Sequence, residues 1–117
     1  MKLIIAGSRD THINVSDIAS KLCDLDVDEV VSGKCPNFKG RISVDYLGEK
    51  WAKIMGIPIE PFPANWNQYG KAAGPIRNEQ MAKYADAVAL FPGGRGTNSM
   101  FFLAKKYNLQ IFDFRGE

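Results

Sequence analysis

The sequence predicts a single α/β domain over residues 1–117, a three-layer arrangement in which a mostly parallel five-stranded sheet lies between two layers of helices. Two observations support this class. Short apolar runs with β character alternate along the chain with segments whose apolar residues recur at helical spacing. The 117 residues suffice for one core and not for two, and they contain no linker, repeat or low-complexity segment.

Five strands are expected, and the third of them carries two prolines. Pro58 and Pro61 each remove a backbone hydrogen-bond donor, which favours an edge position for this strand. The expected strands are Lys2–Ala6, Glu29–Ser32, Ile57–Pro61, Ala87–Phe91 and Gln110–Asp113.

Four helices are expected between the strands, and Phe62–Gly74 is expected to be a loop. Asn14 can cap the first helix, Gly56 suits the end of the second, and Pro75 fits the first position of a third that runs to about Tyr84. The apolar stripes of the other three are Val15, Ile18, Ala19 and Leu22; Val44, Leu47, Trp51 and Ile54; and, within Asn98–Tyr107, Met100, Leu103, Ala104 and Tyr107.

The composition excludes several classes of protein. With 45% hydrophobic and 24% charged residues, and no apolar run near the roughly 20 residues that span a bilayer, it predicts a soluble, cytoplasmic protein without membrane contact. Cys23, Cys35 and His12 supply neither a disulfide framework nor a set of metal ligands, so we expect no metal and no cofactor. The small net charge of +2 argues against a general nucleic-acid binder.

Positive charge gathers in the connections that leave the carboxyl ends of the expected strands. These connections hold seven basic residues and one acid, a net charge of +6, whereas the rest of the chain has eight basic and twelve acidic residues, a net charge of −4. Ligands of such sheets bind beyond the carboxyl ends, where the strand order reverses, so we expect an anionic ligand there. The charged residues are Arg9, Lys34, Lys39, Arg41, Lys71, Arg77 and Arg95, with Asp10 as the acid.

A glycine-rich turn between the fourth strand and the last helix predicts a phosphate site. Glycines allow backbone N–H groups to approach a phosphate closely, and the start of a helix adds partial positive charge. An arginine within the turn can add a charge-assisted contact. The predicted phosphate-binding residues are Gly93, Gly94, Arg95, Gly96, Thr97 and Asn98.

The connection after the first strand is expected to face this turn if the strand order is 3-2-1-4-5. Gly7 and Ser8 can then offer two N–H groups and a hydroxyl to the same ligand, beside Arg9, although a plain turn explains them equally well. The connection lacks the G-x-G-x-x-G spacing, which argues against a tightly held NAD or FAD.

Five further residues have a functional and a structural interpretation. Arg77 lies in the first turn of a helix, where the dipole disfavours a cation, so it either faces an anionic partner or is a solvated surface arginine. Asp45 either contacts a ribose or complements the dipole of its own helix, and Glu49 either assists it or faces solvent. Trp66 and Tyr69 either stack on a base or cover the core.

Four segments together resemble the small SLOG-superfamily proteins of the YspA/YpsA-related group. The resemblance spans nearly the whole chain, and Gly-Pro-Ile-Arg-Asn-x-x-Met is its most specific element. It implies a Rossmann-like sheet and a nucleotide or ADP-ribose-type ligand, and it adds Ser32, Gly33 and Asn78 to the expected ligand-binding residues. The segments are Val30–Gly33, Val44–Ala52, Lys71–Met81 and Gly96-Thr97.

The same superfamily is similar to the LOG phosphoribohydrolases, whose motif is Pro-Gly-Gly-x-Gly-Thr-x-x-Glu. Pro92–Thr97 matches that motif and Arg77 corresponds to the catalytic arginine, but Met100 occupies the position of the glutamate. A thioether transfers no proton, and no spacing supports Glu79 or Asp45 as a substitute. The presence of Met100 in place of the glutamate favours binding over cleavage.

We therefore expect a sensor or sequestering protein for a phosphorylated nucleoside derivative, as a homo-oligomer. Three alternatives remain open. They are a LOG-like N-glycosidase with a replaced acid, single-stranded nucleic-acid binding by analogy with DprA, and a bulkier or more highly charged ligand held by the long Lys34–Ile42 connection.

Overall fold

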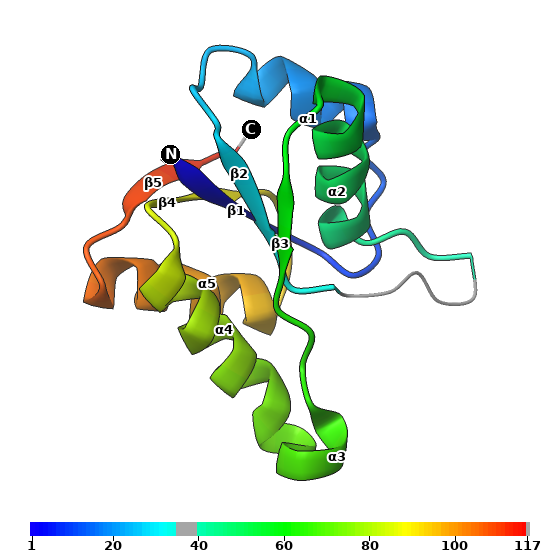
Figure 1. The fold of residues 1–117 in the computed structure, drawn as a ribbon. Coiled ribbons are helices and arrows are strands. Elements are labelled where there is room, and N and C mark those ends of the chain that lie inside the picture. The colour runs from blue at the N-terminus through cyan, green and yellow to red at the C-terminus, as the bar shows by residue number, and fades with distance from the viewer. Residues whose placement is uncertain (35–39, 117) are drawn as a thin grey trace.

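The computed structural model describes residues 1–34 and 40–116 and has a five-stranded sheet in which every pair of neighbours is parallel (Figure 1). The strand order is β3-β2-β1-β4-β5, which confirms the expected α/β class, the expected reversal next to β1 and the edge position of β3. The strands are β1 (Lys2–Ala6), β2 (Glu29–Ser32), β3 (Ile59–Pro61), β4 (Ala87–Leu90) and β5 (Gln110–Asp113).

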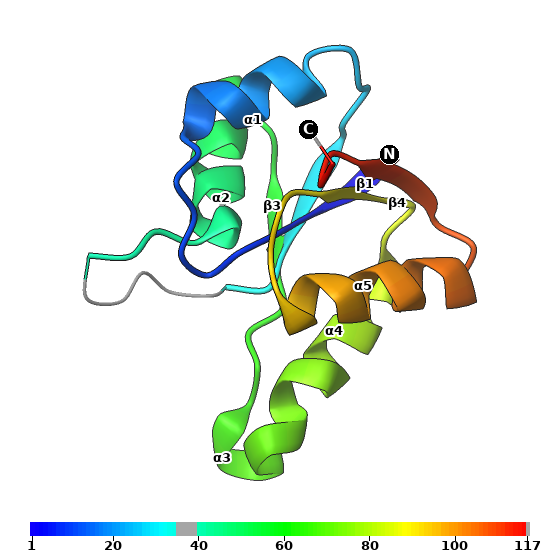
Figure 2. The same cartoon turned by 180° about the vertical axis from the view of Figure 1, so that it is seen from behind.

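Helices cover both faces of the sheet (Figures 1 and 2). Successive side chains of a strand point to opposite faces, so β1 supplies both cores. Leu3 and Ile5 pack with α1 (Val15–Leu22) and α2 (Val44–Met55). Ile4 packs on the opposite side with α4 (Ala73–Tyr84) and α5 (Arg95–Lys106).

The helices on the first face begin and end where the sequence predicts. Asn14 accepts a hydrogen bond from the Asp17 N–H at 3.0 Å, and the Asp17 carboxylate accepts one from the Asn14 N–H at 2.8 Å, which completes a capping box. Gly56 ends α2 with φ of 71°, a left-handed conformation that favours glycine.

The prediction that Ile54 belongs to the buried stripe of α2 is wrong. Ile54 is 65% exposed, because the non-polar residues on the buried face of α2 are Val44, Leu47, Gly48, Trp51 and Ala52. These positions follow the i, i+3, i+4, i+7, i+8 pattern of a core-facing helix.

The segment before α4 is helical rather than a loop. Within the expected loop Phe62–Gly74, α3 (Trp66–Tyr69) is followed by a 3-10 helix, η1 (Gly70–Ala72), that leads directly into α4. Pro75 is therefore the third residue of α4 and not the first. A proline is tolerated there because the first N–H groups of a helix have no intrahelical acceptor.

The last helix also begins earlier than predicted. Because α5 starts at Arg95 and not at Asn98, half of the expected glycine turn is its first helical turn. At the other boundaries, β3 begins two residues later than expected and β4 ends one residue earlier.

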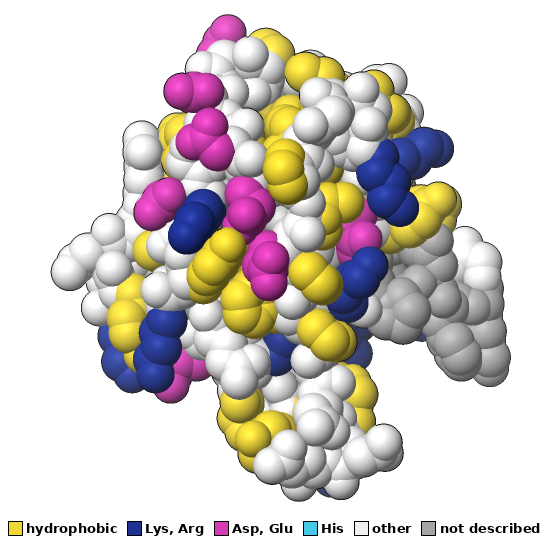
Figure 3. Space-filling view, in the orientation of Figure 1, with side chains coloured by type: hydrophobic (Ala, Val, Ile, Leu, Met, Phe, Trp, Pro, Cys, Tyr) yellow, Lys and Arg dark blue, Asp and Glu magenta, His cyan; other side chains and the backbone are white. Residues whose placement is uncertain are grey.

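Charge is unevenly spread over the surface. Acidic side chains lie over the upper and central parts of the face in Figure 3, while α3 at the bottom of that view shows none. Within the described residues, no helix is long and apolar enough to cross a membrane.

Candidate functional site

The connections that leave β1 and β4 are in direct contact. The Ser8 N–H donates a hydrogen bond to the Pro92 carbonyl at 3.0 Å. A Cβ on Gly93 would lie 2.8 Å from the Ser8 nitrogen, so only glycine allows this approach. The structure thus brings the two predicted phosphate loops together, but the Ser8 N–H is already bonded within the protein.

Gly7 serves packing between β1 and α2. A Cβ at this position would lie 2.6 Å from Val44 Cγ2 and 3.1 Å from Phe91 Cβ. The Val44 N–H also donates to the Ser8 carbonyl at 2.9 Å. The missing side chain of Gly7 therefore lets α2 begin directly against the loop after β1.

At the start of α5, the first backbone N–H groups have no acceptor among the described residues. The N-cap residue, Gly94, makes no side-chain capping bond, and the first N–H groups of a helix have no intrahelical acceptor. Thr97, in the first turn, is 3% exposed, and its hydroxyl oxygen has no hydrogen-bond partner among the described residues. A buried hydroxyl without a partner is costly, and an anion at the helix start would satisfy it together with the N–H groups.

A cleft of about 340 Å³ opens between these loops and the start of α4. Nine of the predicted ligand-binding residues line it: Gly7, Ser8, Arg9, Asp45, Arg77, Asn78, Arg95, Gly96 and Thr97. Its other lining residues include Ser43, Trp66, Lys71, Gly74, Pro75, Ser99 and Met100.

Five predicted residues do not line the cleft. Gly93 and Gly94 directly precede the first residue of α5. Asn98 accepts a hydrogen bond from Arg115 Nη1 at 3.1 Å. Ser32 is buried and donates to Glu49 Oε2 at 2.6 Å. The fifth residue, Gly33, supports Arg77.

Arg77 is held by acceptors of the protein itself. Its Nη1 donates to the Gly33 carbonyl, and its Nε donates to Asn78 Oδ1 at 2.8 Å. A Cβ on Gly33 would lie 2.8 Å from Arg77 Nη1 and 3.1 Å from Asp45 Oδ2. Arg77 and Asp45 therefore both approach Gly33 at the end of β2 and line the cleft from there, and Gly33 is the residue that leaves them room.

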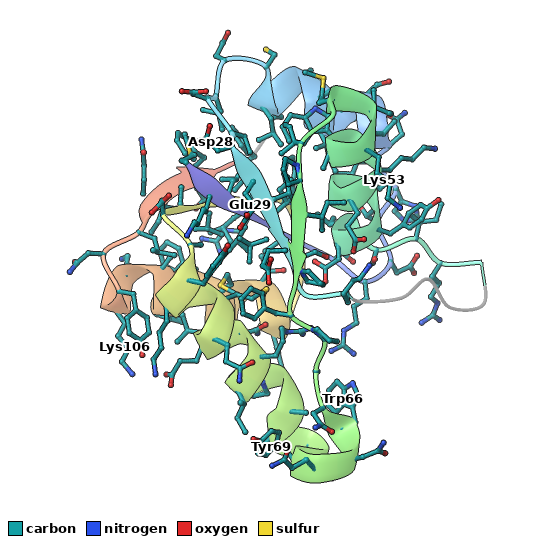
Figure 4. All side chains as sticks on the ribbon, in the orientation of Figure 1. Asp28, Glu29, Lys53, Trp66, Tyr69 and Lys106 are labelled. Carbon is teal, nitrogen blue, oxygen red and sulfur yellow. The ribbon has the colours of Figure 1, made fainter. Side chains whose placement is uncertain are left out.

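The two aromatic residues of α3 project from the lower end of the molecule (Figure 4). Trp66 is 53% exposed and lines the cleft, so it does not cover the core. Tyr69 instead lines a separate hollow of about 210 Å³, which shares Arg77 with the cleft.

Sequence reasoning missed several residues that line the cleft. The sequence places Lys71 only among the basic residues of the connections between strands and helices, because it predicts a loop where the short helices α3 and η1 carry Lys71 to the cleft. Ser99 follows from the early start of α5, since it lies three residues after Gly96 on the same helical face.

Carboxylates are scarce at the cleft. Among the described residues that line it, Asp45 is the single acid, and Met100 is 1% exposed in the core beneath. Glu79 lies outside, 3.4 Å from Lys106 Nζ and 3.8 Å from Lys83 Nζ. The hydrogen bond from Lys106 lowers the pKa of Glu79, so this acid is unsuited to donating a proton.

The Lys34–Ile42 connection is predicted to hold a bulkier or more highly charged ligand. Residues 35–39 of this connection lie outside the described residues. Lys34 itself forms an ion pair with Glu49 at 2.8 Å. In the part of the chain that the structure describes, no group of histidine, cysteine and acidic residues could hold a metal ion.

No protein-family model matches the chain, and no curated protein matches it. Its structure is similar to the X-ray structure of TM1055, a structural-genomics target, with a TM-score of 0.65 and 16% identity over 94% of this chain and 71% of that one. At this identity the likeness shows the Rossmann-like fold alone. A predicted subunit of a tRNA methyltransferase from Methanocaldococcus jannaschii aligns with 98% of this chain and 67% of its own at 18% identity, but its TM-score of 0.46 is too low to indicate a shared fold.

Proposed function

We propose that the cleft binds a phosphorylated nucleoside derivative, such as a nucleotide or an ADP-ribose-type or cyclic nucleotide signal, and that the protein senses or sequesters it. The observation that carries the proposal is the unpartnered, buried hydroxyl of Thr97 in the first turn of α5, at the wall of a cleft with four cations. A helix start with free donors favours a phosphate group. The proposal also agrees with the Rossmann-like fold, because ligands of such sheets bind beyond the carboxyl ends of the strands.

The other lining residues suit the remaining parts of such a ligand. Asp45 can accept hydrogen bonds from ribose hydroxyls, as acidic residues do in related sheets. Trp66 offers an exposed aromatic face for a base. Arg9 and Arg95 supply positive charge next to the helix start.

One observation favours a second function, cleavage of the N-glycosidic bond. Asp45 lies beside Arg77 in the cleft and is the acid that could replace the missing glutamate. Such an enzyme needs a proton donor for the leaving base, whereas Met100 provides none. Binding without cleavage therefore has the stronger support.

The test compares Thr97→Val with the same substitution at Thr11, which lies outside the cleft. Mass spectrometry of gently purified protein identifies a retained ligand, and calorimetry measures the affinity for common nucleoside phosphates. Because valine keeps the shape but removes the hydroxyl, we expect Thr97→Val to weaken binding about tenfold and Thr11→Val to leave it unchanged.

Failure of every nucleoside phosphate to bind would refute the proposed function. Chromatography of the protein incubated with nucleoside phosphates distinguishes cleavage of the N-glycosidic bond from binding alone. Free base that appears with the native protein, and disappears with Arg77→Ala, would show that the cleft cleaves its ligand.

A further inference from the structure

We infer that the ligand of the cleft carries two linked phosphate groups rather than one. The inference rests on the proposed function and narrows its ligand class. It follows from the charge that the cleft leaves uncompensated.

Three exposed cations reach the cleft from three separate elements. Arg9 follows β1, Lys71 belongs to η1, and Arg95 is the first residue of α5. Within residues 1–34 and 40–116, none of the three forms an ion pair.

The nearest acids are already engaged. Asp10, next to Arg9, lies 3.8 Å from Arg41 Nε. Asp45, the single acid among the described lining residues, lies with Arg77 at Gly33. The three unpaired cations therefore keep their charge toward the cleft.

The position of Arg95 strengthens this point. The start of a helix carries about half a positive charge, so a cation in the first turn is disfavoured unless an anion is bound there. Three cations and this helix start together exceed the charge of one phosphate monoester, which is about −1.5 to −2 near neutral pH. A second, linked phosphate brings the negative charge that the cleft lacks.

Calorimetric titration with inorganic phosphate and inorganic pyrophosphate tests the inference without knowledge of the base. The buffer contains no divalent cations, so that pyrophosphate keeps its charge. We expect pyrophosphate to bind at least tenfold more tightly than phosphate, since each added charge-assisted contact contributes about tenfold. Nucleoside diphosphates should bind more tightly than the corresponding monophosphates by a similar factor.

Variants of cleft residues test whether the preference for pyrophosphate over phosphate arises in the cleft. Lys71→Ala and Arg95→Ala should each reduce the preference for pyrophosphate several-fold. Lys53→Ala is the matched control, because it removes the same charge from α2, far from α3 in Figure 4. The preference should remain unchanged in that control.

The outcomes separate the inference from the proposed function. Equal affinity for mono- and diphosphates would overturn the inference and leave nucleotide binding intact. A preference that survives Lys71→Ala and Arg95→Ala, or falls equally with Lys53→Ala, would also overturn it. Absence of binding by every phosphate compound would overturn both.

Discussion

Single residues of the glycine-rich segment have different roles, although they belong to one motif in the sequence. A Cβ on Gly93 would lie 2.2 Å from Thr97 Oγ1 and close to the backbone of the β1 connection. A Cβ on Gly96 would meet no atom within 4 Å, and this residue lines the cleft. Gly93 thus serves the fold, whereas Gly96 borders open space at the cleft.

We predict opposite effects of alanine at these two positions. Gly93→Ala should lower the free energy of unfolding by about 1–3 kcal/mol, because the added methyl group forces the two connections apart. Gly96→Ala should raise it by up to about 1 kcal/mol, because alanine favours the helix, while ligand affinity falls. Urea denaturation and calorimetry measure the two effects.

Gly94→Ala is the control for ligand affinity, since its Cβ also meets open space but Gly94 does not line the cleft. If Gly96→Ala bound the ligand as well as the native protein, the first turn of α5 would not be the phosphate site.

At the scale of elements, a buried polar cluster joins β2 to α2. The Ser32 hydroxyl donates to Glu49 Oε2 at 2.6 Å and accepts from the Lys34 N–H at 3.1 Å, and Lys34 Nζ contacts the other oxygen of Glu49. Between Ser32 and Lys34 lies Gly33, whose carbonyl holds Arg77. The cluster therefore fixes the peptide on which Arg77 rests at the cleft.

We predict that Glu49→Ala lowers the free energy of unfolding by about 1–3 kcal/mol, because the buried Ser32 hydroxyl loses its acceptor. Lys50→Ala, the exposed neighbour on α2, should change stability by less than about 0.5 kcal/mol. Thermal and urea unfolding measure both variants. Equal stability of the two would contradict a structural role for the cluster.

Sequence patterns predicted the regular elements better than the short ones. The cap at Asn14 and the helix end at Gly56 follow from local chemistry, so the sequence predicts them directly. The four-residue helix α3 has no repeated apolar pattern, and nothing in it is buried. For that reason the position of Lys71 at the cleft could not be predicted.

At the scale of the whole molecule, strand alternation was enough to predict both the fold and the end of the sheet where the cleft lies. Strand order places the connections after β1 and β4 together in any sheet of this topology. The pattern could not show which donors remain free. The Ser8 N–H, for example, is bonded to Pro92, and Arg77 is bonded to Gly33, and both facts depend on contacts between distant segments.

Another contact between distant segments makes the stability of the whole fold depend on pH. Tyr84, near the end of α4, donates a hydrogen bond to Glu29 at the start of β2 (Glu29 is labelled in Figure 4). This bond raises the pKa of Tyr84 from 10.0 to about 12, because an ionised phenol can no longer donate and would face the carboxylate. The folded protein thus retains the phenolic proton at pH values where the unfolded chain loses it.

The contribution of this contact is complete below pH 10 and disappears as the pH rises through about 12. We therefore predict that the free energy of unfolding of the native protein falls more steeply over this interval than that of Tyr84→Phe, which keeps the ring packed against Phe62. Lysines titrate in the same range in both proteins, so the difference between the two urea-denaturation series isolates Tyr84. Parallel curves from pH 10 to pH 12 would mean that the Tyr84–Glu29 bond does not stabilise the fold.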